Sequence, residues 1–412
     1  MSYRNFSTAQ MQEMDAAHHL HPFTDHKELR EAGTRIISRA DGAFIYDTEG
    51  NAYLDMVAGV SACTLGHQPQ RVNDAIKKQL DTYSHVMVYG EYAQHPATEL
   101  CKLLASHLPY PLTKTYLVNS GTEAIEGALK LARRVTGRSQ LISCHNAYHG
   151  NTMGSLSVMG FEERKQIFRP LIPDVDFITF NNEADLEKIT TKTAGILLET
   201  IQGGAGFIEP QNDFLKKVRQ RCNEVGAVMI LDEIQPGFGR TGKLFGFQNY
   251  DVVPDVVVMG KGMGGGMPVG AFTASEQMMD LLSHNPKLGH ITTFGGHPII
   301  AAASLATLQE VTETNLMSET LEKEQLFRSL LVHPLIKEIR GRGLMIAAMT
   351  ESPEITNEVI LRCHKRGVIL FWLLFEGCAI RITPPLTISN EEIIKGCGII
   401  IEVLNEIEKE MK

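Results

Sequence analysis

The chain has 412 residues, 43% of them hydrophobic, so it can bury a large core and is long enough for two domains. Its formal net charge of −9 and its pI near 5.9 argue against a nucleic-acid-binding surface, which would be basic. The seven cysteines are odd in number, scattered and without a C-x-x-C pair, which predicts reduced thiols in a cytoplasmic protein rather than a disulfide framework or a zinc site.

The first forty residues show no clear periodicity, and we expect them to be irregular. Their polar start, MSYRNFSTAQMQEMD, lacks the apolar core of a signal peptide. The segment HHLHPFTDH (18–26) is predicted to be a loop. Its histidines could bind a metal ion, but no carboxylate or cysteine stands at ligand spacing, so we expect no metal site. The next segment, DGAFIYDTEGNAYLDMVAG (41–59), predicts a β-hairpin that turns at Thr-Glu-Gly-Asn.

From residue 70 to residue 300, short apolar runs alternate with helical patterns. The clearest strands are LISC (141–144), GILLET (195–200), AVMILDE (227–233) and DVVVMG (255–260). The clearest helix is FLKKVRQRCNEVG (214–226), which ends on a glycine as helices often do. Such alternation predicts a mostly parallel sheet with helices on both faces.

Beyond about residue 305 the pattern becomes α+β. We expect a helix over 306–327, strands within 339–349, 367–372 and 378–386, and a closing amphipathic helix over 390–411. The longest apolar run, VILFWLLF (368–375), is too short to span a bilayer and is predicted to be a buried strand.

These patterns predict an α/β fold with two domains. A large domain is expected over 51–304 and a smaller C-terminal domain over 305–412, with a cleft between them. Residues 1–50 are expected to pack with the smaller domain.

One polar turn follows a strand in YLVNSGTEAIEGALKLAR (116–133). Ser120, Gly121 and Thr122 begin the helix there, where the first N–H groups have no helical partner and the helix dipole favours an anion. A plain helix N-cap, assisted by Glu123, is the structural alternative.

Two charged residues stand at the ends of other strands. Asp232 follows four apolar residues, so its carboxylate needs a cationic partner, either a protonated pyridine nitrogen or Arg240. Lys261 ends the run VVVMGK among glycines, which predicts a lowered pKa and a nucleophilic amine, with a solvated surface lysine as the alternative. A lysine, a buried carboxylate and an anion-binding helix start together indicate pyridoxal phosphate.

Two other phosphate motifs fail on their structural context. The glycines of 260–265 match a dinucleotide fingerprint but lead to Pro268 and further glycines instead of a helix. GFGRTGK (237–243) nearly matches a P-loop, but Leu244 replaces its Ser or Thr and Pro236 stands where a strand should end.

The chain resembles the class III (ω-type) aminotransferases of pyridoxal-phosphate fold type I over nearly its whole length. The matching segments are NSGTEAIEGALKLAR, AYHGNT, ETIQGGAGF, LDEIQPGFGRTGK, VVVMGKGMGGGMPVGA, TTFGGHP and RITPPL. The resemblance implies a homodimer with shared active sites, which transfers an amino group from a donor to a 2-oxo acid. It implies neither a nucleic-acid nor a membrane partner.

The same resemblance assigns roles to individual residues. Lys261 is implied to be the Schiff-base lysine and Asp232 the partner of the pyridinium nitrogen. Thr293 is implied to reach the phosphate of the neighbouring subunit, and Arg381 to bind a substrate carboxylate. The implied cofactor-binding residues are Ser120, Gly121, Thr122, Tyr148, His149, Glu199, Asp232, Gln235, Lys261 and Thr293.

Within the family, the chain looks closest to the ornithine and acetylornithine branch, although HPFTD is similar to ω-amino acid:pyruvate enzymes. It departs from the branch pattern at Asn151, Thr200, Gly204 and His297. Because Gly204 has no side chain to pair with Arg381 and Asn151 brings no cation, we expect substrates with one carboxylate and pyruvate as acceptor.

Two alternatives stay open. The first is a racemase, epimerase or aminomutase that uses the same cofactor. The second is a non-catalytic binding protein of the same fold.

Overall fold

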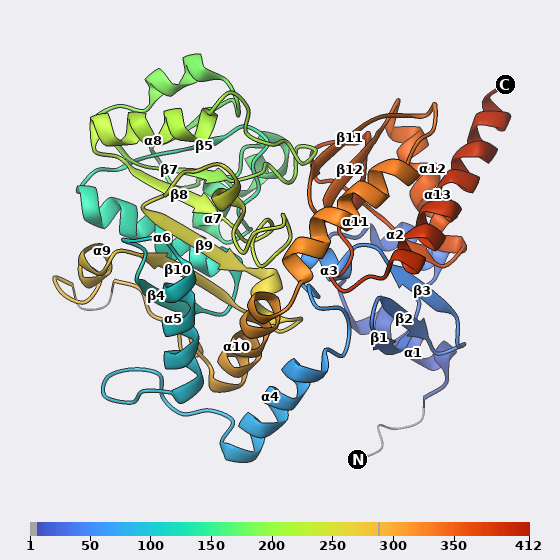
Figure 1. The fold of residues 1–412 in the computed structure, drawn as a ribbon, viewed down its shortest axis with the longest axis horizontal. Coiled ribbons are helices and arrows are strands. Elements are labelled where there is room, and N and C mark those ends of the chain that lie inside the picture. The colour runs from blue at the N-terminus through green and yellow to red at the C-terminus, as the bar shows by residue number, and fades with distance from the viewer. Residues whose placement is uncertain (1–5, 287–288) are drawn as a thin grey trace.

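Residues 6–286 and 289–412 are described by the computed structural model, in which they form one seven-stranded sheet and two four-stranded sheets (Figure 1). The large sheet, in the order β4-β10-β9-β8-β7-β5-β6, occupies the left lobe of Figure 1. The smaller sheets, β1-β2-β3-β13 and β11-β12-β15-β14, occupy the right lobe, together with the C-terminal end of the chain. The predicted α/β fold is confirmed.

The N-terminal part comprises α1 (Thr8–His18), α2 (His26–Ala32), β1 (Ile37–Asp41), β2 (Phe44–Asp47), β3 (Ala52–Asp55), α3 (Ala58–Ser61), α4 (Gln70–Thr82) and α5 (His95–His107). The expectation of an irregular N-terminus is wrong. A capping box of Ser7 and Gln10 starts α1, but α1 buries no residue, so it left no apolar periodicity in the sequence. The predicted hairpin is confirmed, with β2 antiparallel to β3.

The large sheet is built from β4 (Lys114–Val118), β5 (Gln140–Cys144), β6 (Val175–Ile178), β7 (Thr193–Glu199), β8 (Val228–Asp232), β9 (Val256–Gly260) and β10 (Gly270–Ala274). Its other elements are α6 (Gly121–Thr136), α7 (Met153–Ser157), η1 (Glu162–Arg164), η2 (Gln166–Phe168), η3 (Glu183–Lys188), α8 (Phe214–Val225), η4 (Gly246–Asn249), η5 (Lys261–Gly264) and α9 (Glu276–Asp280). Only β10 is antiparallel to its neighbours, so the predicted mostly parallel sheet is confirmed.

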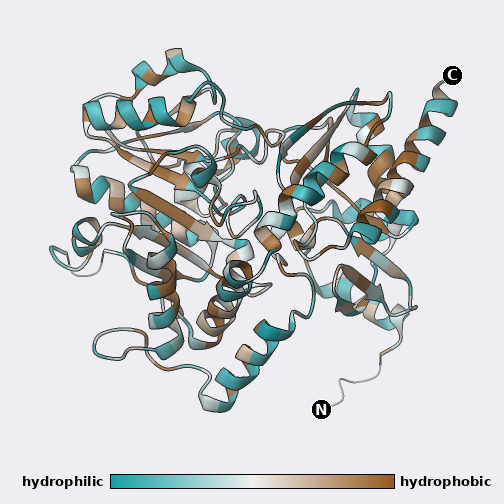
Figure 2. Cartoon of the chain, in the orientation of Figure 1, coloured by the Kyte–Doolittle hydropathy of each residue, from teal (hydrophilic) through white to brown (hydrophobic). Residues whose placement is uncertain are grey.

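Both faces of the large sheet are buried, which explains its continuous apolar strands. Ile230 and Val258 face a core that includes α6, whereas Leu231 and Val257 face a second core that includes α8 and α10. Figure 2 shows these strands as the hydrophobic interior of the lobe. Because β5 to β9 run parallel, their carboxyl ends meet at one edge of the sheet.

The C-terminal part comprises α10 (Pro298–Glu313), α11 (Leu316–Leu330), β11 (Ile336–Arg342), β12 (Met345–Thr350), α12 (Pro353–Lys365), β13 (Val368–Ile369), β14 (Phe371–Trp372), β15 (Ala379–Ile382) and α13 (Asn390–Met411). The helix predicted over 306–327 is two helices, broken between Glu313 and Leu316. The single strand predicted over 368–375 is also wrong, because β13 pairs with β3 and β14 pairs with β15 in another sheet.

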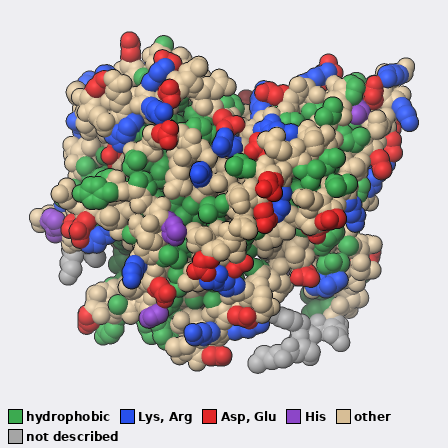
Figure 3. Space-filling view, in the orientation of Figure 1, with side chains coloured by type: hydrophobic (Ala, Val, Ile, Leu, Met, Phe, Trp, Pro, Cys, Tyr) green, Lys and Arg blue, Asp and Glu red, His purple; other side chains and the backbone are tan. Residues whose placement is uncertain are grey.

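We keep the domain division at residues 50 and 304 as a proposal. β3 falls inside the expected large domain but pairs in parallel with β13 of the C-terminal part. The first five residues of the N-terminal segment lie outside the described residues. None of the described helices has the length and apolar character to cross a membrane, and charges of both signs are interspersed over the face drawn in Figure 3.

Candidate active site

The three segments singled out at strand ends meet at one edge of the large sheet. A Cβ added at Gly121 would lie 2.8 Å from the side chain of Ile234, two residues after Asp232. A Cβ at Gly260, directly before Lys261, would lie 3.3 Å from the Cα of Gly121. Glycine therefore allows the helix start, the Asp232 loop and the Lys261 loop to touch.

The start of α6 has the properties of an anion-binding site. Ser120 is its N-cap and accepts a hydrogen bond from the Glu123 N–H at 3.3 Å, so the N-cap alternative is also correct. Within the described chain, the N–H groups of Gly121 and Thr122 have no acceptor. Free N–H groups and the helix dipole favour a phosphate here. The Thr122 hydroxyl is already bonded to Ser155 at 2.6 Å.

Asp232 ends β8 and is only 4% exposed. Its carboxylate accepts a hydrogen bond from the Ile234 N–H at 2.9 Å and lies 2.8 Å from Nδ1 of the buried His149. The alternative partner, Arg240, instead donates to the carbonyls of Leu344 and Pro384. Among the described residues, Asp232 is paired with no cation except a protonated His149, so this carboxylate is available to a positively charged ligand.

Several buried polar atoms around Asp232 have no hydrogen-bond partner among the described residues. They include Nε2 of His149, Nε2 of Gln235 and Nε of Arg381. Buried polar groups in native proteins are nearly always paired, so these atoms fit a site completed by a polar ligand. A phosphorylated pyridine with a ring hydroxyl and a substrate carboxylate offers the acceptors that these groups require.

Lys261 begins η5 directly after β9 and has a positive φ of 44°, an uncommon and strained backbone conformation for a non-glycine residue. Burial lowers the pKa of its amine; the charge of Asp232 opposes this shift and that of Arg381 adds to it. Lys261 as a whole residue has intermediate exposure. The alternative of an ordinary surface lysine does not fit this environment.

Glu199 ends β7 and is paired in register with Asp232 of β8. It accepts hydrogen bonds from the N–H groups of Gly203 at 3.0 Å and Tyr148 at 3.3 Å. Burial raises the pKa of Glu199 to about 7, with His149 opposing the shift and Asp232 adding to it. Glu199 therefore links the segment of Tyr148 to the strand ends.

Arg381 reaches the site from β15, in a different sheet. It is 4% exposed, and within the described chain its guanidinium forms no ion pair; the guanidinium carbon lies 5.9 Å from the centroid of the Phe207 ring. Burial lowers the pKa of Arg381 to about 10, which still leaves it charged at neutral pH. A buried guanidinium without an anion is suited to a carboxylate ligand.

Sequence reasoning missed an aromatic wall beside Gly204. A Cβ at Gly204 would lie 2.8 Å from the Phe375 ring, which stacks on Phe161 with 4.7 Å between centroids. The guanidinium of Arg164 lies 5.5 Å from Phe375 and 5.0 Å from Phe23. The only signal in the sequence was the glycine itself, since a larger residue at position 204 would collide with the wall.

The other residues that depart from the pattern of the acetylornithine branch lie in different surroundings. Thr200 donates a hydrogen bond to the buried Glu233 at 2.5 Å. His297 stacks on His85 with 5.0 Å between ring centroids, and Asn151 is exposed. Thr293 is also exposed, and no hydrogen bond joins it to the Ser120 turn within the described chain.

Comparisons with known proteins agree with this geometry. The family model "Aminotransferase class-III" matches residues 28–404. The chain is 37% identical over 384 residues to an acetylornithine aminotransferase of Caldanaerobacter subterraneus subsp. tengcongensis, covering 90% of this chain and 95% of that protein. The predicted resemblance to the class III aminotransferases and to their acetylornithine branch is therefore confirmed.

Solved structures give the same result for the fold. A transaminase from the marine bacterium Virgibacillus superposes with a TM-score of 0.92 at 26% identity, over 98% of this chain and 100% of that one. An ornithine aminotransferase of Toxoplasma gondii, described with partial occupancy of PLP at its active site, superposes with a TM-score of 0.88 at 28% identity, over 98% and 95% of the two chains. The predicted fold type is confirmed.

Proposed function

This chain belongs to the class-III aminotransferase family of pyridoxal-phosphate-dependent enzymes, and we propose that Lys261 is the residue that binds its cofactor covalently and moves the reacting proton. The observation that carries this proposal is the amine of lowered pKa at the end of β9, beside a buried carboxylate and a helix start with free N–H groups. A lowered pKa increases the share of neutral amine, which can attack an aldehyde and later accept a proton.

The remaining residues would hold the cofactor from three sides. The turn of residues 120–122 would bind the phosphate, and Asp232, oriented by His149, would face the pyridine nitrogen. The buried Nε2 of Gln235 has no hydrogen-bond partner among the described residues, which suits the ring hydroxyl. Tyr148 has a half-buried ring that suits one face of the pyridine.

When bound, pyridoxal phosphate supplies an aldehyde carbon for the amino group and a ring that withdraws electrons from the reacting carbon. The negative charge of Asp232 would keep the pyridine nitrogen protonated, as that withdrawal requires. Lys261 would take the proton from the donor's Cα and deliver it to the cofactor carbon that keeps the nitrogen after the transfer. Arg381 would orient substrates by binding a carboxylate with two N–H groups. The acceptor oxo acid would then pass through the same steps in reverse.

We also propose a cytoplasmic homodimer with shared active sites. Exposed apolar side chains of the 80–92 and 291–294 segments suit burial against a second copy: Leu80, Val86, Met87, Tyr89, Tyr92, Ile291 and Phe294. Thr293 lies within the second segment and would reach the phosphate site of the partner subunit. A fully active monomer in sedimentation at assay concentration would refute this arrangement. The scattered, unpaired cysteines support a cytoplasmic location.

For the substrates, we propose a donor with one carboxylate and pyruvate as the acceptor. Arg381 has no paired acid in the described chain, so it is available to one carboxylate. The wall of Phe375 and Phe161 is apolar, and Arg164 beside it already donates to the Leu374 carbonyl at 3.0 Å. The aromatic faces of this wall would offer a second carboxylate no hydrogen-bond donor, and one N–H of Arg164 is already used by the Leu374 carbonyl.

The test of transamination is a pair of half-reactions followed by absorbance. A donor amine should remove the near-visible band of the Lys261-bound cofactor, and an oxo acid should restore it. A band that persists while the amino acid racemises would favour the racemase or aminomutase alternative. No cofactor band at all would favour the binding protein. A preference in kcat/KM for 2-oxoglutarate over pyruvate of about tenfold or more would refute the acceptor proposal.

A further inference from the structure

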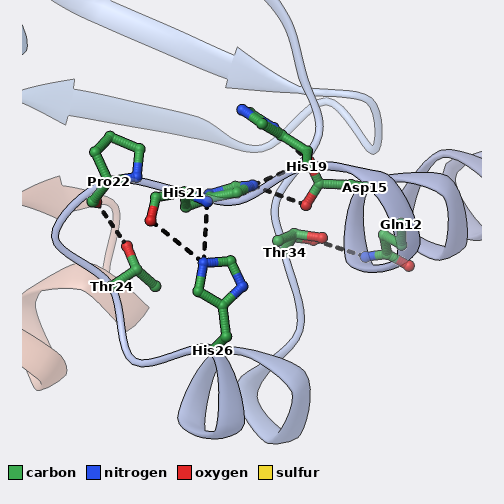
Figure 4. A network of polar contacts seen from close by, with 8 residues as sticks. All are labelled: Gln12, Asp15, His19, His21, Pro22, Thr24, His26 and Thr34. Carbon is green, nitrogen blue, oxygen red and sulfur yellow. Dashed lines mark hydrogen bonds and ion pairs between the residues drawn. The ribbon is translucent and has the colours of Figure 1, made fainter.

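A carboxylate and two imidazoles converge where α1 ends (Figure 4). The Asp15 Oδ1 lies 3.0 Å from Nδ1 of His19, and its Oδ2 lies 2.9 Å from Nε2 of His21. The three ligand atoms all lie within 4.8 Å of one another. The expectation that no carboxylate accompanies the histidines of segment 18–26 is therefore wrong: the acid lies in the preceding helix, outside the segment in which it was sought.

Local structure produces this convergence. Asp15 and His19 are four residues apart at the end of α1, so they share one face of the helix. His19 is the C-cap in an extended conformation, with φ −117° and ψ 123°. The His21 ring lies beside that of His19, with 4.5 Å between the ring centroids. The end of α1 and the residues that follow it thus present three ligands within seven residues.

The turn after His21 is held by its own contacts. The backbone N–H of His21 donates to Nε2 of His26 at 2.9 Å, and the Thr24 hydroxyl donates to the Pro22 carbonyl at 3.0 Å. Across the base of the turn, Gln12 donates to the Thr34 carbonyl at 2.7 Å. These contacts fix the position of His21 without using the ring nitrogen that faces Asp15.

We propose that Asp15, His19 and His21 form a site for a divalent transition-metal ion such as Zn²⁺. Two imidazole nitrogens and one carboxylate oxygen are ligands that zinc takes at about 2.0–2.2 Å, and a water molecule completes a tetrahedron. In such a tetrahedron, neighbouring ligand atoms stand about 3.3 Å apart. The carboxylate–imidazole distances of 2.9 and 3.0 Å need to lengthen by only a few tenths of an ångström. Calcium and magnesium, which prefer all-oxygen ligands, do not suit the two imidazoles.

The three ligands are accessible to an ion from solvent. Side-chain exposure is 18% for Asp15, 29% for His21 and 65% for His19. Without a metal, exposed hydrogen bonds of this kind contribute little to stability. The site is therefore not needed for the fold, and its ligands can be replaced without loss of the folded protein.

The bound ion has a structural role that follows from the turn it fixes. The turn carries Phe23, whose positive φ of 53° is strained for an aromatic residue. The Phe23 ring lies 6.2 Å from that of Phe371, and Phe371 pairs with Arg381 between β14 and β15. A metal ion would thus stiffen the turn that carries Phe23, which packs near the strand next to Arg381.

The test is a titration of the full-length holoenzyme with ZnCl₂ by calorimetry. Wild type should bind one Zn²⁺ per chain. Asp15→Asn and His21→Ala should each weaken the zinc affinity by about tenfold or more, because even the loss of a group that only orients a ligand weakens metal affinity by about 10–100-fold. His18→Ala is the matched control, since His18 is adjacent in the chain but outside the cluster, and should titrate as wild type. Thermal melts of all variants should be unchanged before zinc is added.

Hydrogen exchange provides a second readout. Zinc should slow exchange of the amides of residues 15–26 in wild type and His18→Ala, but not in His21→Ala. Equal zinc affinity in wild type, Asp15→Asn and His21→Ala would overturn the proposal, because any binding would then belong to other groups. Absence of zinc binding to wild type would overturn it as well.

Discussion

Replacement of Arg381 by methionine should weaken substrate binding and at the same time stabilise the protein. The guanidinium is 4% exposed, and its Nε has no hydrogen-bond partner in the described chain. Methionine has a similar length and no charge. The substitution therefore removes a buried cation that lacks an anion, while the backbone pairing of β15 with β12 and β14 remains.

The two effects can be given magnitudes. A hydrogen bond to a charged group contributes about 1.5–3 kcal/mol, so losing both bonds of a two-pronged carboxylate contact should lower kcat/KM by at least about 100-fold. Removing a poorly paired buried charge should stabilise the unliganded protein by about 1–3 kcal/mol. Activity should fall while stability rises, because the positive charge of Arg381 contributes to ligand binding and not to the stability of the unliganded fold.

The assay compares kcat/KM for a donor with a carboxylate and for an amine without one, alongside thermal melting of the substrate-free enzyme. The amine should react nearly as well as in wild type. Arg366→Met, which removes an exposed arginine paired with Glu406, is the control for loss of a positive charge. An equal fall for both donors, or a melting temperature several degrees below wild type, would refute the reasoning.

Three further predictions concern single residues. Lys261→Ala should abolish turnover while the protein still folds and retains cofactor through its phosphate; activity within about tenfold of wild type would exclude the assigned role. Asp232→Asn should slow proton removal in single turnover by at least ~100-fold. The hydrogen bond to Asp55 raises the pKa of His67 to about 9, so its stabilising contribution should be complete below about pH 6.5 and be lost as the pH rises through 9. His67→Gln should flatten the fall in melting temperature over that range, and an unchanged slope would contradict the assignment.

The parts of the site that could be predicted from sequence lie next to strongly apolar strands. Asp232 and Lys261 stand at the ends of strands that are buried on both faces, so their positions followed from a local pattern. Parallel strands then bring such ends to one edge, whatever the details of the connecting helices. The start of α6 was equally visible, since a serine, a glycine and a threonine directly follow β4.

Features that depend on distant contacts could not be predicted. The wall formed by Phe375 against Gly204 joins residues about 170 positions apart, and no local pattern records such packing. The division of 368–375 between two sheets has the same cause, because pairing with β3 decides where β13 goes. The helix α1 was missed for the opposite reason: it buries nothing, so its only signal was the capping pattern of Ser7 and Gln10.

The charges at the sheet edge explain why the site is incomplete without a ligand. Burial lowers the pKa of Lys261 and Arg381 and raises the pKa of Glu199. In each case the shift shows that burial disfavours the charged form of the group. Bound cofactor and substrate would supply the missing phosphate, ring nitrogen and carboxylate together. It follows that cofactor loading should raise the melting temperature of wild type more than that of Asp232→Asn, because only the wild type can complete the contact with the ring nitrogen.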